Sequence, residues 1–596
     1  MRANRATLTS VAPLYAQPMR STRTGPLFNT FSYPTKIDPE AIAVFIAVHT
    51  EPGAKILDPF GGSGTTGIAA RLCENPTQRM RKIAQQMGVK PNWGPRDAVI
   101  YELSPMGALV GRVLASPPCP TLFRDRALQL LKQAEMDVQW MYEAEDPSGA
   151  TGDIRHVIWT ELLRTPCCGT EITYWSAAVR RNPLRLESEF ECPTCKSMAS
   201  VNKCDRARND VGTRVRRPVW IWGRTGKRSW DRAVSEVDIA LLNRIGEMAI
   251  DQAVPDVKIV WGDLYRSGYH VGIDKFVDLY TPRNLRVFAH LWGLVADEPG
   301  DLGAALRTWL LSYNASHSTL MTRVVVKKQQ TDFVITGAQS GVMYISGLPV
   351  EKNILAGLRR KMKTFVDAFS ITYGGKSVID VVNGSSTNLA LANDTVDYVF
   401  TDPPFGDFIP YAEINQVNEV WLGEVTNRTN EVIVSRAQGK GIGEYHRLMG
   451  DVFSEVARVL KPAGAVTVVF HASKPEIWRA LGEALDANDL WVERTNIWDK
   501  TQVSFKQVVH QGSTRHDALF LLRPRDADSA ETPKVPIGPI TPESIAIGAK
   551  GLPDAQSPRR LYTRYVMACI ASGHPVEHSA PQFYAALRGA SEVGIP

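Results

Sequence analysis

Apolar and polar residues along the chain follow two spacings, one typical of buried strands and one typical of amphipathic helices. Short apolar runs bounded by turn residues predict strands, and they lie at 54–58, 97–105, 377–382, 396–401, 465–472 and 517–522. Helical spacing predicts helices at 38–50 and 445–464. Asp38 can cap the first helix, and the KPAG segment at 461–464 is expected to end the second. A strand, a glycine-rich turn, a helix and a second strand are typical of a doubly wound α/β sheet.

The predicted strands form two groups, separated by a long stretch without strand pattern. One α/β domain of about seven strands is therefore expected to be split by an insertion. The division that follows is a basic flexible arm at 1–27, a first domain part at 28–149, the insertion at 150–370, a second domain part at 371–525, and a linker with a small helical tail at 526–596.

Length and composition narrow the class of protein. The chain has 596 residues, 44% of them hydrophobic and 22% charged, which indicates a soluble globular protein of two or three units. Its formal net charge of +6 is compatible with a polyanionic partner. No apolar run reaches membrane-spanning length and no secretory h-region is present, so we expect a cytoplasmic protein. The lack of acidic residues before Asp38 fits an organelle transit peptide, but a disordered basic arm is the favoured interpretation.

The segment ILDPFGGSGTTGIAARL, residues 56–72, raises the question of what its glycine-rich turn binds. Gly62, Gly64 and Gly67 fit the dinucleotide pattern G-x-G-x-x-G, but Glu102, the next acidic strand end, lies further away than that pattern requires. A P-loop needs a lysine after its last glycine, and this turn has none. S-adenosylmethionine has no phosphates. Its ribose would suit an acid at the end of the second strand, and its α-amino group would suit an acid near the first turn.

A second motif, TDPPF at 401–405, follows another predicted strand. Because parallel strands end at one edge of a sheet, Asp58 and Asp402 are expected to face one cleft. The two prolines fix the backbone and lack N–H donors, which leaves a carboxylate and carbonyl oxygens as acceptors beside the Phe405 ring. Such a surface suits an exocyclic amino group on a flat ring. The plainer interpretation is that both motifs are ordinary turns after strands.

With these two motifs the sequence resembles the amino-methyltransferases of DNA, which carry D-P-F-x-G-S-G-T-T and D/N/S-P-P-Y/F. More closely, it resembles the bacterial adenine-specific DNA methylases that contain a zinc ribbon. Further shared motifs are YPTKIDPEAI at 33–42, E/D-x-N/S-P at 102–105, T-P-R-N-L at 281–285, D-P-P-Y-x-D-x-x-P-Y at 402–411 and W-L at 421–422. The resemblance covers residues 28–525 and implies a Rossmann-like methyltransferase sheet.

The resemblance also implies S-adenosylmethionine as the methyl donor and a site built from two sets of residues. The cofactor-binding residues would be Tyr33, Pro34, Thr35, Lys36, Asp58, Pro59, Phe60, Gly61, Gly62, Ser63, Gly64, Thr65, Thr66, Glu102 and Ser385. The catalytic residues would be Asp402, Pro403, Pro404 and Phe405. In the implied reaction Asp402 and the Pro403 carbonyl accept both amino hydrogens of a flipped base, while Phe405 stacks on its ring.

The first residue of the second motif bears on the choice of base. In the family D-P-P-Y/F goes mostly with adenine N6 and S-P-P-Y mostly with cytosine N4, so the sequence favours a site-specific adenine-N6 DNA methyltransferase. Cytosine N4 stays an alternative, because the two amino groups are chemically alike. The remaining alternatives are a non-catalytic nucleic-acid-binding protein on the same fold and a nicotinamide-dependent oxidoreductase. Double-stranded DNA is the expected partner, and proteins of a restriction-modification or phage-defence system are further candidates.

Four of the eight cysteines resemble the two halves of a zinc ribbon, which indicates metal rather than disulfides in a reducing cytoplasm. One half is a regular C-x-x-C, whereas Thr165 occupies the first cysteine position of the other half. Because a closed structural zinc site needs four ligands, Cys167 or Cys204 is expected to supply the fourth. The favoured ligands are Cys167, Cys168, Cys192 and Cys195. A degenerate ribbon without metal is the alternative.

A strongly basic stretch, residues 203–232, follows the cysteines. Its tryptophans are Trp220, Trp222 and Trp230, and its basic residues are Lys203, Arg206, Arg208, Arg214, Arg216, Arg217, Arg224, Lys227, Arg228 and Arg232. Basic residues interleaved with aromatic ones suit a phosphate backbone and unstacked bases, so we expect DNA contact here. An ordinary solvated face is the alternative.

Overall fold

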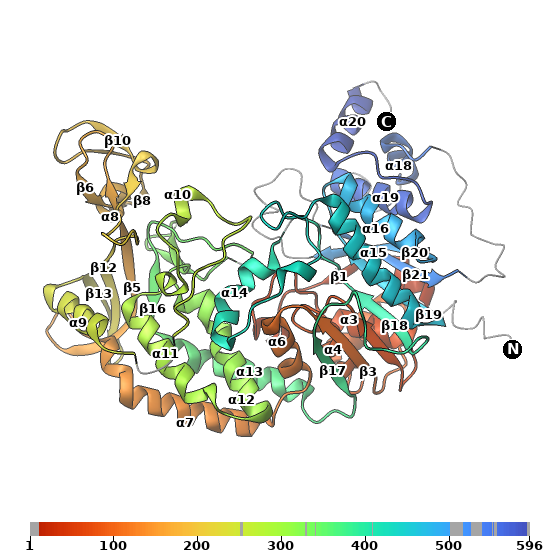
Figure 1. Cartoon of the computed structure of the whole chain (residues 1–596), viewed down its shortest axis with the longest axis horizontal. Helices are drawn as coiled ribbons and strands as arrows, with labels where there is room; N and C mark the ends of the chain where they lie inside the picture. The colour runs from red at the N-terminus through yellow and green to blue at the C-terminus, as the bar shows by residue number, and fades with distance from the viewer. Residues whose placement is uncertain are drawn as a thin grey trace.

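The computed structural model of the chain places eight strands in one mixed sheet (Figure 1). The structure describes residues 11–250, 254–327, 330–339, 341–407, 409–500, 516–525, 539–550, 552 and 557–592. The strands are, in spatial order, β1 (Met19–Ser21), β20 (Leu490–Lys500), β21 (His516–Pro524), β19 (Leu460–Phe470), β18 (Val396–Thr401), β2 (Lys55–Asp58), β3 (Asp97–Glu102) and β17 (Ile379–Asn383). Neighbouring strands pair in parallel, except in the two pairs that β21 makes.

Alternate residues of the strands point into two cores, one on each side of the sheet. Leu519 and Leu521 of β21 belong to one core, and Phe520 and Leu522 to the other. The first face is covered by α3 (Pro39–His49), α4 (Thr65–Leu72) and α6 (Pro105–Ala115), the second by α15 (Ile442–Val459), α16 (Pro475–Asp486) and α19 (Pro558–Ala571). This arrangement confirms the predicted doubly wound α/β class.

Two details of the predicted elements are wrong. Helix α15 ends at Val459 and β19 begins directly at Leu460, so the 461–464 segment starts a strand instead of ending a helix. Strand β20 was not predicted, because Glu493, Arg494 and Asn496 interrupt its apolar pattern.

The predicted flexible arm is also wrong for residues 11–27. Leu14 is fully buried, and the Tyr15 hydroxyl lies 3.1 Å from His49 Nε2. The Asn496 amide donates to the carbonyls of Leu14 and Gln17, and β1 extends the sheet beside β20. Its apolar side chains therefore dock this segment, although its charged residues are all basic. Residues 1–10 lie outside the described part of the chain.

The chain leaves the sheet after α6 and returns to it at β17. In between it forms a second sheet around β5 (Thr151–Arg164), which pairs with β4 (Glu143–Glu145), β6 (Glu171–Thr173), β11 (Asp205–Arg206), β12 (Arg216–Thr225) and β16 (Val350–Lys352); β12 also pairs with β13 (Arg228–Ala233). The long helices of this region are α7 (Pro120–Val138), α9 (Glu236–Glu247), α11 (Pro282–Ala296), α12 (Gly300–Tyr313) and α13 (Ile354–Thr372).

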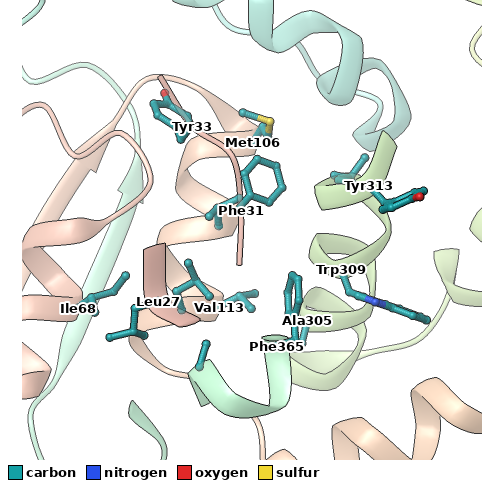
Figure 2. Packing of buried hydrophobic residues seen from close by; sticks show 14 of the residues in the cluster. Leu27, Phe31, Tyr33, Ile68, Met106, Val113, Ala305, Trp309, Tyr313 and Phe365 are labelled. Carbon is teal, nitrogen blue, oxygen red and sulfur yellow. The ribbon is translucent and has the colours of Figure 1, made fainter. Parts of the chain in front are cut away.

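The inserted helices share a core with the sheet's first face. Figure 2 shows Met106 and Val113 of α6 on one side, and Ala305 and Trp309 of α12 on the other, with Phe31 between them. The insertion is therefore packed onto the sheet domain through a continuous apolar core.

The C-terminal segment packs against the sheet's second face. Besides α19 it forms α18 (Pro542–Gly548) and α20 (Ala580–Glu592), and Tyr562, Tyr565 and Phe583 are buried in the second core. Most of the predicted linker, residues 526–538, lies outside the described residues. Among the helices that the structure describes, none is both long and apolar enough to cross a bilayer.

Candidate active site and cysteine cluster

A cleft of about 980 Å³ opens where β2, β3, β17 and β18 end. Most of the predicted site residues line it: Tyr33, Pro34, Thr35, Lys36, Asp58, Pro59, Phe60, Gly61, Gly62, Ser63, Thr65, Thr66, Glu102, Ser385, Asp402 and Pro404. The structure thus brings the two motifs to one cleft. Gly64, Pro403 and Phe405 are not among the lining residues.

Asp58 joins the two motifs directly. Its carboxylate accepts hydrogen bonds from the Phe60 amide at 3.0 Å, the Thr66 hydroxyl at 2.6 Å and the Thr401 hydroxyl at 2.9 Å. Burial raises the pKa of Asp58 to about 6, against these hydrogen bonds. Since Thr401 precedes Asp402, Asp58 fixes the end of β18 relative to the glycine-rich turn.

The glycine-rich turn is held close to β3 and α6. Gly64 has φ of +74°, and a Cβ there would lie 2.4 Å from Cα of Gly111 in α6. Its role is therefore close helix packing, which explains why it does not line the cleft. The Gly62 amide donates to Glu102 Oε2 at 2.6 Å.

Glu102 lies at the end of β3, as the sequence predicts. Its other oxygen accepts from the Ser104 amide at 2.8 Å. Burial raises the pKa of Glu102 from its ordinary value of 4.5 to about 8. A carboxylate has more acceptor sites than these two amides use, so Glu102 can also accept hydrogen bonds from a ligand in the cleft.

Two tyrosines form one wall of the cleft. The rings of Tyr33 and Tyr411 stack with their centroids 6.1 Å apart, and the Tyr411 hydroxyl lies 2.8 Å from Thr35 Oγ1. Lys36 is buried, and its Nζ donates to the Leu27 carbonyl at 2.8 Å. Burial lowers the pKa of Lys36 to about 7.

Residues from the second face of the sheet contact the TDPPF motif and hold it in place. The Tyr445 hydroxyl of α15 donates to the Pro404 carbonyl at 2.7 Å. The Phe405 ring is 8% exposed and meets the rings of Phe470 and His471 edge to face, at 5.7 and 5.8 Å. Phe405 therefore has little free surface in this conformation.

Sequence reasoning missed several residues that line the cleft. They are Ser104, Ser386, Tyr411, Thr426, Asn430 and Glu431. Ser104 and Tyr411 belong to segments that the sequence analysis quoted as family motifs, so a signal existed for these two. The loop after α14 (Tyr411–Leu422) carries Thr426, Asn430 and Glu431, and nothing in its local pattern marks it as part of the site.

The four predicted metal ligands lie together in the insertion. The sulfur atoms of Cys167, Cys168, Cys192 and Cys195 are all within 4.8 Å of one another, so these residues could hold a metal ion. Cys204 is instead buried, with its thiol 3.4 Å from the Ser200 carbonyl. Of the two candidates for the fourth ligand, the geometry selects Cys167.

The irregular half of the ribbon has the same backbone as the regular half. The Gly169 amide donates to the Thr165 carbonyl, as the Lys196 amide does to the Cys192 carbonyl, and both bonds are 3.0 Å long. Gly169 and Lys196 both have positive φ, at +73° and +61°. Thr165 therefore occupies the structural position of Cys192, and Cys167, two residues further along, supplies the sulfur that Thr165 lacks. We call residues 165–200 the ribbon.

The three tryptophans of the basic stretch differ in burial, and the structure corrects the expectation of base contact for Trp230. Trp220 lies between the Arg181 guanidinium, 4.0 Å from its ring centroid, and Trp175. Trp222 stacks on His156 at 4.9 Å, and Trp230 is buried. Trp230 therefore offers no ring for stacking on bases, whereas Trp220 and Trp222 are half-buried and pack part of their surface against these neighbours.

The basic residues of the stretch divide into two groups. Arg206, Arg214, Arg228 and Arg232 are held in ion pairs with Glu161, Asp146 or Asp238, and burial lowers the pKa of Arg216 to about 10. Lys203, Arg208, Arg217, Arg224 and Lys227 are exposed. The second group and the exposed Arg228 can meet an external polyanion.

Comparison with known proteins adds family information for part of the chain. No curated protein matches the sequence. Among solved structures, a SAM-dependent methyltransferase of Methanosarcina mazei is similar at 11% identity and a TM-score of 0.15, over 26% of this chain and 77% of its own. A Pyrococcus horikoshii protein is similar at 14% identity and a TM-score of 0.14, over 28% and 68%. At such TM-scores the fold assignment rests on the strand order of the sheet itself.

A family model described as DNA methylase matches residues 13–75. This range contains β1, α3, β2, the glycine-rich turn and α4. It therefore includes the first of the two motifs that meet in the cleft. The match supports a DNA methylase family for this chain.

Proposed function

We propose that the chain is a methyltransferase that transfers a methyl group from S-adenosylmethionine to N6 of a flipped adenine in double-stranded DNA. The observation that carries this proposal is the convergence of Asp402 and Glu102 on one cleft, at the ends of β18 and β3. The match of residues 13–75 to DNA methylases supports it independently.

The cleft fits a cofactor without phosphates. Lys36 is the one cationic residue among its described lining residues, and its Nζ already donates to a backbone carbonyl. The phosphates of a nucleoside triphosphate would therefore find no free cation here, which argues against a P-loop nucleotide site. Glu102 would accept the ribose hydroxyls, and the turn from Asp58 to Thr66 would hold the rest of the cofactor. When bound, the cofactor supplies a methyl group on a positively charged sulfur.

The chain's own contribution to the reaction is orientation. Asp402 and the Pro403 carbonyl would accept the two amino hydrogens, which turns the nitrogen lone pair toward the methyl group. The Pro404 carbonyl is already occupied by Tyr445. Such positioning can remove about 7–11 kcal/mol of a barrier at best. Flipping the base costs a few kcal/mol. Stacking on Phe405 would return roughly 1–3 kcal/mol, and it requires that the ring turn out of its contact with Phe470 and His471.

The test is transfer of labelled methyl from S-adenosylmethionine to DNA, followed by separation of the digested nucleosides. N6-methyladenine is the expected product, whereas N4-methylcytosine would identify the alternative base. Asp402→Ala should abolish transfer while cofactor affinity survives, because the lost contact acts mainly in the transition state. Asp380→Ala changes an exposed aspartate on β17 and is the matched control. Transfer at the wild-type rate by Asp402→Ala would overturn the assignment.

We also propose that the four ribbon cysteines hold one structural zinc ion. A tetrahedral site with Zn–S bonds of about 2.3 Å places its sulfurs about 3.8 Å apart. The cysteine sulfurs lie 3.5 Å apart for Cys168 and Cys192, 3.3 Å for Cys167 and Cys195, and 3.9 Å for Cys167 and Cys168. Three of the four side chains are exposed, which gives an ion access to them.

Metal analysis of protein purified without chelators should return about one zinc per chain. Cys195→Ala and Cys167→Ala should lose it, and Cys204→Ala should keep it. Because Thr165 lies at the position of the missing regular cysteine, adding Thr165→Cys to Cys167→Ala should restore the zinc. A wild-type chain without metal would mean that the ribbon is vestigial.

A further inference from the structure

A second hollow lies where the ribbon joins the rest of the insertion, and we call it the ribbon hollow. It has about 1330 Å³ of empty volume. Five basic side chains line it, against Asp205 and Asp210: Arg164, which pairs with Glu171 at 3.0 Å, and Lys203, Arg206, Arg208 and Arg214. A hollow with this balance of charge attracts anions.

The wall of the ribbon hollow holds two arginine side chains against one buried glutamate. Glu161 is 2% exposed and pairs with Arg214 at 2.7 Å and with Arg206 at 2.8 Å. One carboxylate is thus shared by two guanidinium groups. The remaining guanidinium N–H groups hold backbone carbonyls, including Gly268 at 3.2 Å and Val271 at 2.7 Å, so the wall is fixed in place.

The rim supplies cations that are free to bind a ligand. Lys203 and Arg208 are exposed, and neither makes an ion pair with any residue that the structure describes. Arg208 precedes a tight turn in which the Gly212 amide donates to the Asn209 carbonyl at 2.9 Å. The backbones of Arg208 and Arg214 pair across this turn in an isolated antiparallel β-bridge. Its backbone is therefore held at the rim.

The ribbon hollow is tied to the catalytic cleft by a short piece of chain. Glu413 of α14 accepts from the Gly262 and Leu264 amides at 2.7 and 3.1 Å. Only four residues separate Leu264 from Gly268 in the hollow, a span of at most about 15 Å. With the two residues from Glu413 to Tyr411 added, Gly268 of the hollow lies within about 30 Å of Tyr411 of the cleft, which is less than one turn of DNA.

We propose that the ribbon hollow binds phosphates of the DNA strand within one helical turn of the base that enters the cleft. The identity of the ligand as DNA rests on the proposed function. The hollow contacts the phosphate backbone, and such contacts fix the position of the DNA without reading its sequence. Lys203 and Arg208 make the phosphate contacts, and the Glu161–Arg206–Arg214 wall supports them.

Salt-dependent binding of a labelled DNA duplex, measured without S-adenosylmethionine, tests this proposal. The double variant Lys203→Ala/Arg208→Ala should weaken binding roughly three- to tenfold and lower the slope of log K against log salt by about 1.8, or 0.9 for each lost contact. Asp210→Asn, which removes a negative charge from the rim, should strengthen binding. Arg124→Ala removes an exposed arginine that pairs with its neighbour on α7, and it is the matched control.

Unchanged affinity and slope in the double variant, beside an unchanged control, would overturn the proposal. Loss of affinity for an RNA duplex but not for DNA would also overturn it, in favour of RNA as the ligand. Once the methylated base is mapped, the DNA duplex can be shortened toward it from either end. When less than about 10 bp remain on the side that reaches the hollow, the slope of log K against log salt should fall by about 1.8, because the two phosphate contacts are lost. The DNA-binding measurements do not depend on methyl transfer. A failure of the proposed methyltransferase activity can therefore be distinguished from a failure of phosphate binding at the ribbon hollow.

Discussion

Asp58 is the residue that makes one site out of two distant motifs. Its carboxylate bonds Thr66 of α4 and Thr401 of β18, and thereby sets the position of the neighbouring Asp402. As the acid near the first turn, Asp58 would suit the cofactor's α-amino group. The structure shows that much of its hydrogen-bonding capacity is used inside the protein. Its main effect on the site is through the position of the β18 end.

Glu102 should make cofactor affinity dependent on pH. In the protein without cofactor its pKa is about 8, against an ordinary 4.5. Between these values the folded chain holds a proton that the unfolded chain has lost, so stability falls as the pH rises through this range. Ribose hydroxyls would favour the ionised carboxylate. Affinity for S-adenosylmethionine should therefore rise from pH 6.5 to 8, by up to about tenfold per pH unit.

Calorimetry in buffers of different ionisation enthalpy measures both the affinity and the proton released. Lys36 has a pKa of about 7 in the same cleft, so the informative quantity is the difference between wild type and Glu102→Gln. The variant should bind weakly and lose the rise with pH. An identical pH profile in the two proteins would exclude Glu102 as the ribose acceptor.

Phe405 should show a packing role and a stacking role in different variants. Its ring is almost buried against Phe470 and His471, so Phe405→Ala should cost about 3–5 kcal/mol of stability. Phe405→Leu keeps much of the volume but loses the aromatic face, and should weaken productive DNA binding by about 1–3 kcal/mol. Phe405→Tyr should keep both functions. Thermal unfolding and methylation kinetics separate the two effects, and wild-type kinetics in Phe405→Leu would argue against stacking.

At the scale of single residues, the sequence predicted the parts of the site that follow strand ends. Asp58, Glu102 and Asp402 could be placed because parallel strands end at one edge. Asn430 and Glu431 could not, because they reach the cleft through the path of a loop that no local pattern specifies. The burial of Phe405 was likewise unpredictable, since it depends on α15 and β19, which arrive later in the chain.

Among the elements, β1 shows best how charge can mislead a prediction. The charged residues of the segment around it, Arg20 and Arg23, are both basic, yet Leu14 and Met19 are buried in the sheet domain's core. Short strands of this kind carry too few residues to show a period, so pairing with β20 could not be read from the sequence. The longer elements α3, β2, β3 and β18 were predictable because their apolar runs end at clear turn residues.

The N-terminal segment should therefore contribute to stability. Leu14→Ala removes a fully buried side chain and should cost about 2–5 kcal/mol. Arg20→Ala changes an exposed residue of β1 and should stay within about 0.5 kcal/mol of wild type. Chemical denaturation of the two variants checks this. Equal stability for both would mean that the segment is detached in solution.

In the whole molecule, helix α14 stands between the catalytic cleft and the insertion. Tyr411 at its start lines the cleft, Glu413 and Gln416 hold residues 260–264, and Trp421 contacts Tyr280 and Phe288. The helix thus connects the part that would bind DNA with the part that would hold the reacting base.

Loss of this connection should affect DNA use more than cofactor use. Glu413→Ala leaves the Gly262 and Leu264 amides without their acceptor, at a cost of about 1–3 kcal/mol for each buried group. Hydrogen exchange of residues 260–266 should accelerate, and KM for DNA should rise while cofactor affinity stays the same. Glu444→Ala, on the exposed side of α15, is the control. A variant with normal exchange in this segment and a normal KM would contradict the coupling.

The pairing of β2 with β18 also bears on how the chain is made. Asp58 and Thr401 are bonded to each other although 343 residues separate them. At about 5–20 residues per second, a ribosome needs roughly 20–70 s to deliver the second strand after the first. Through that interval one edge of β2 has no neighbour and is open to pairing with other chains. The insertion is synthesised during the wait, so its early packing against α6 would shield the nascent half-sheet, and its truncation should yield aggregates rather than a smaller enzyme.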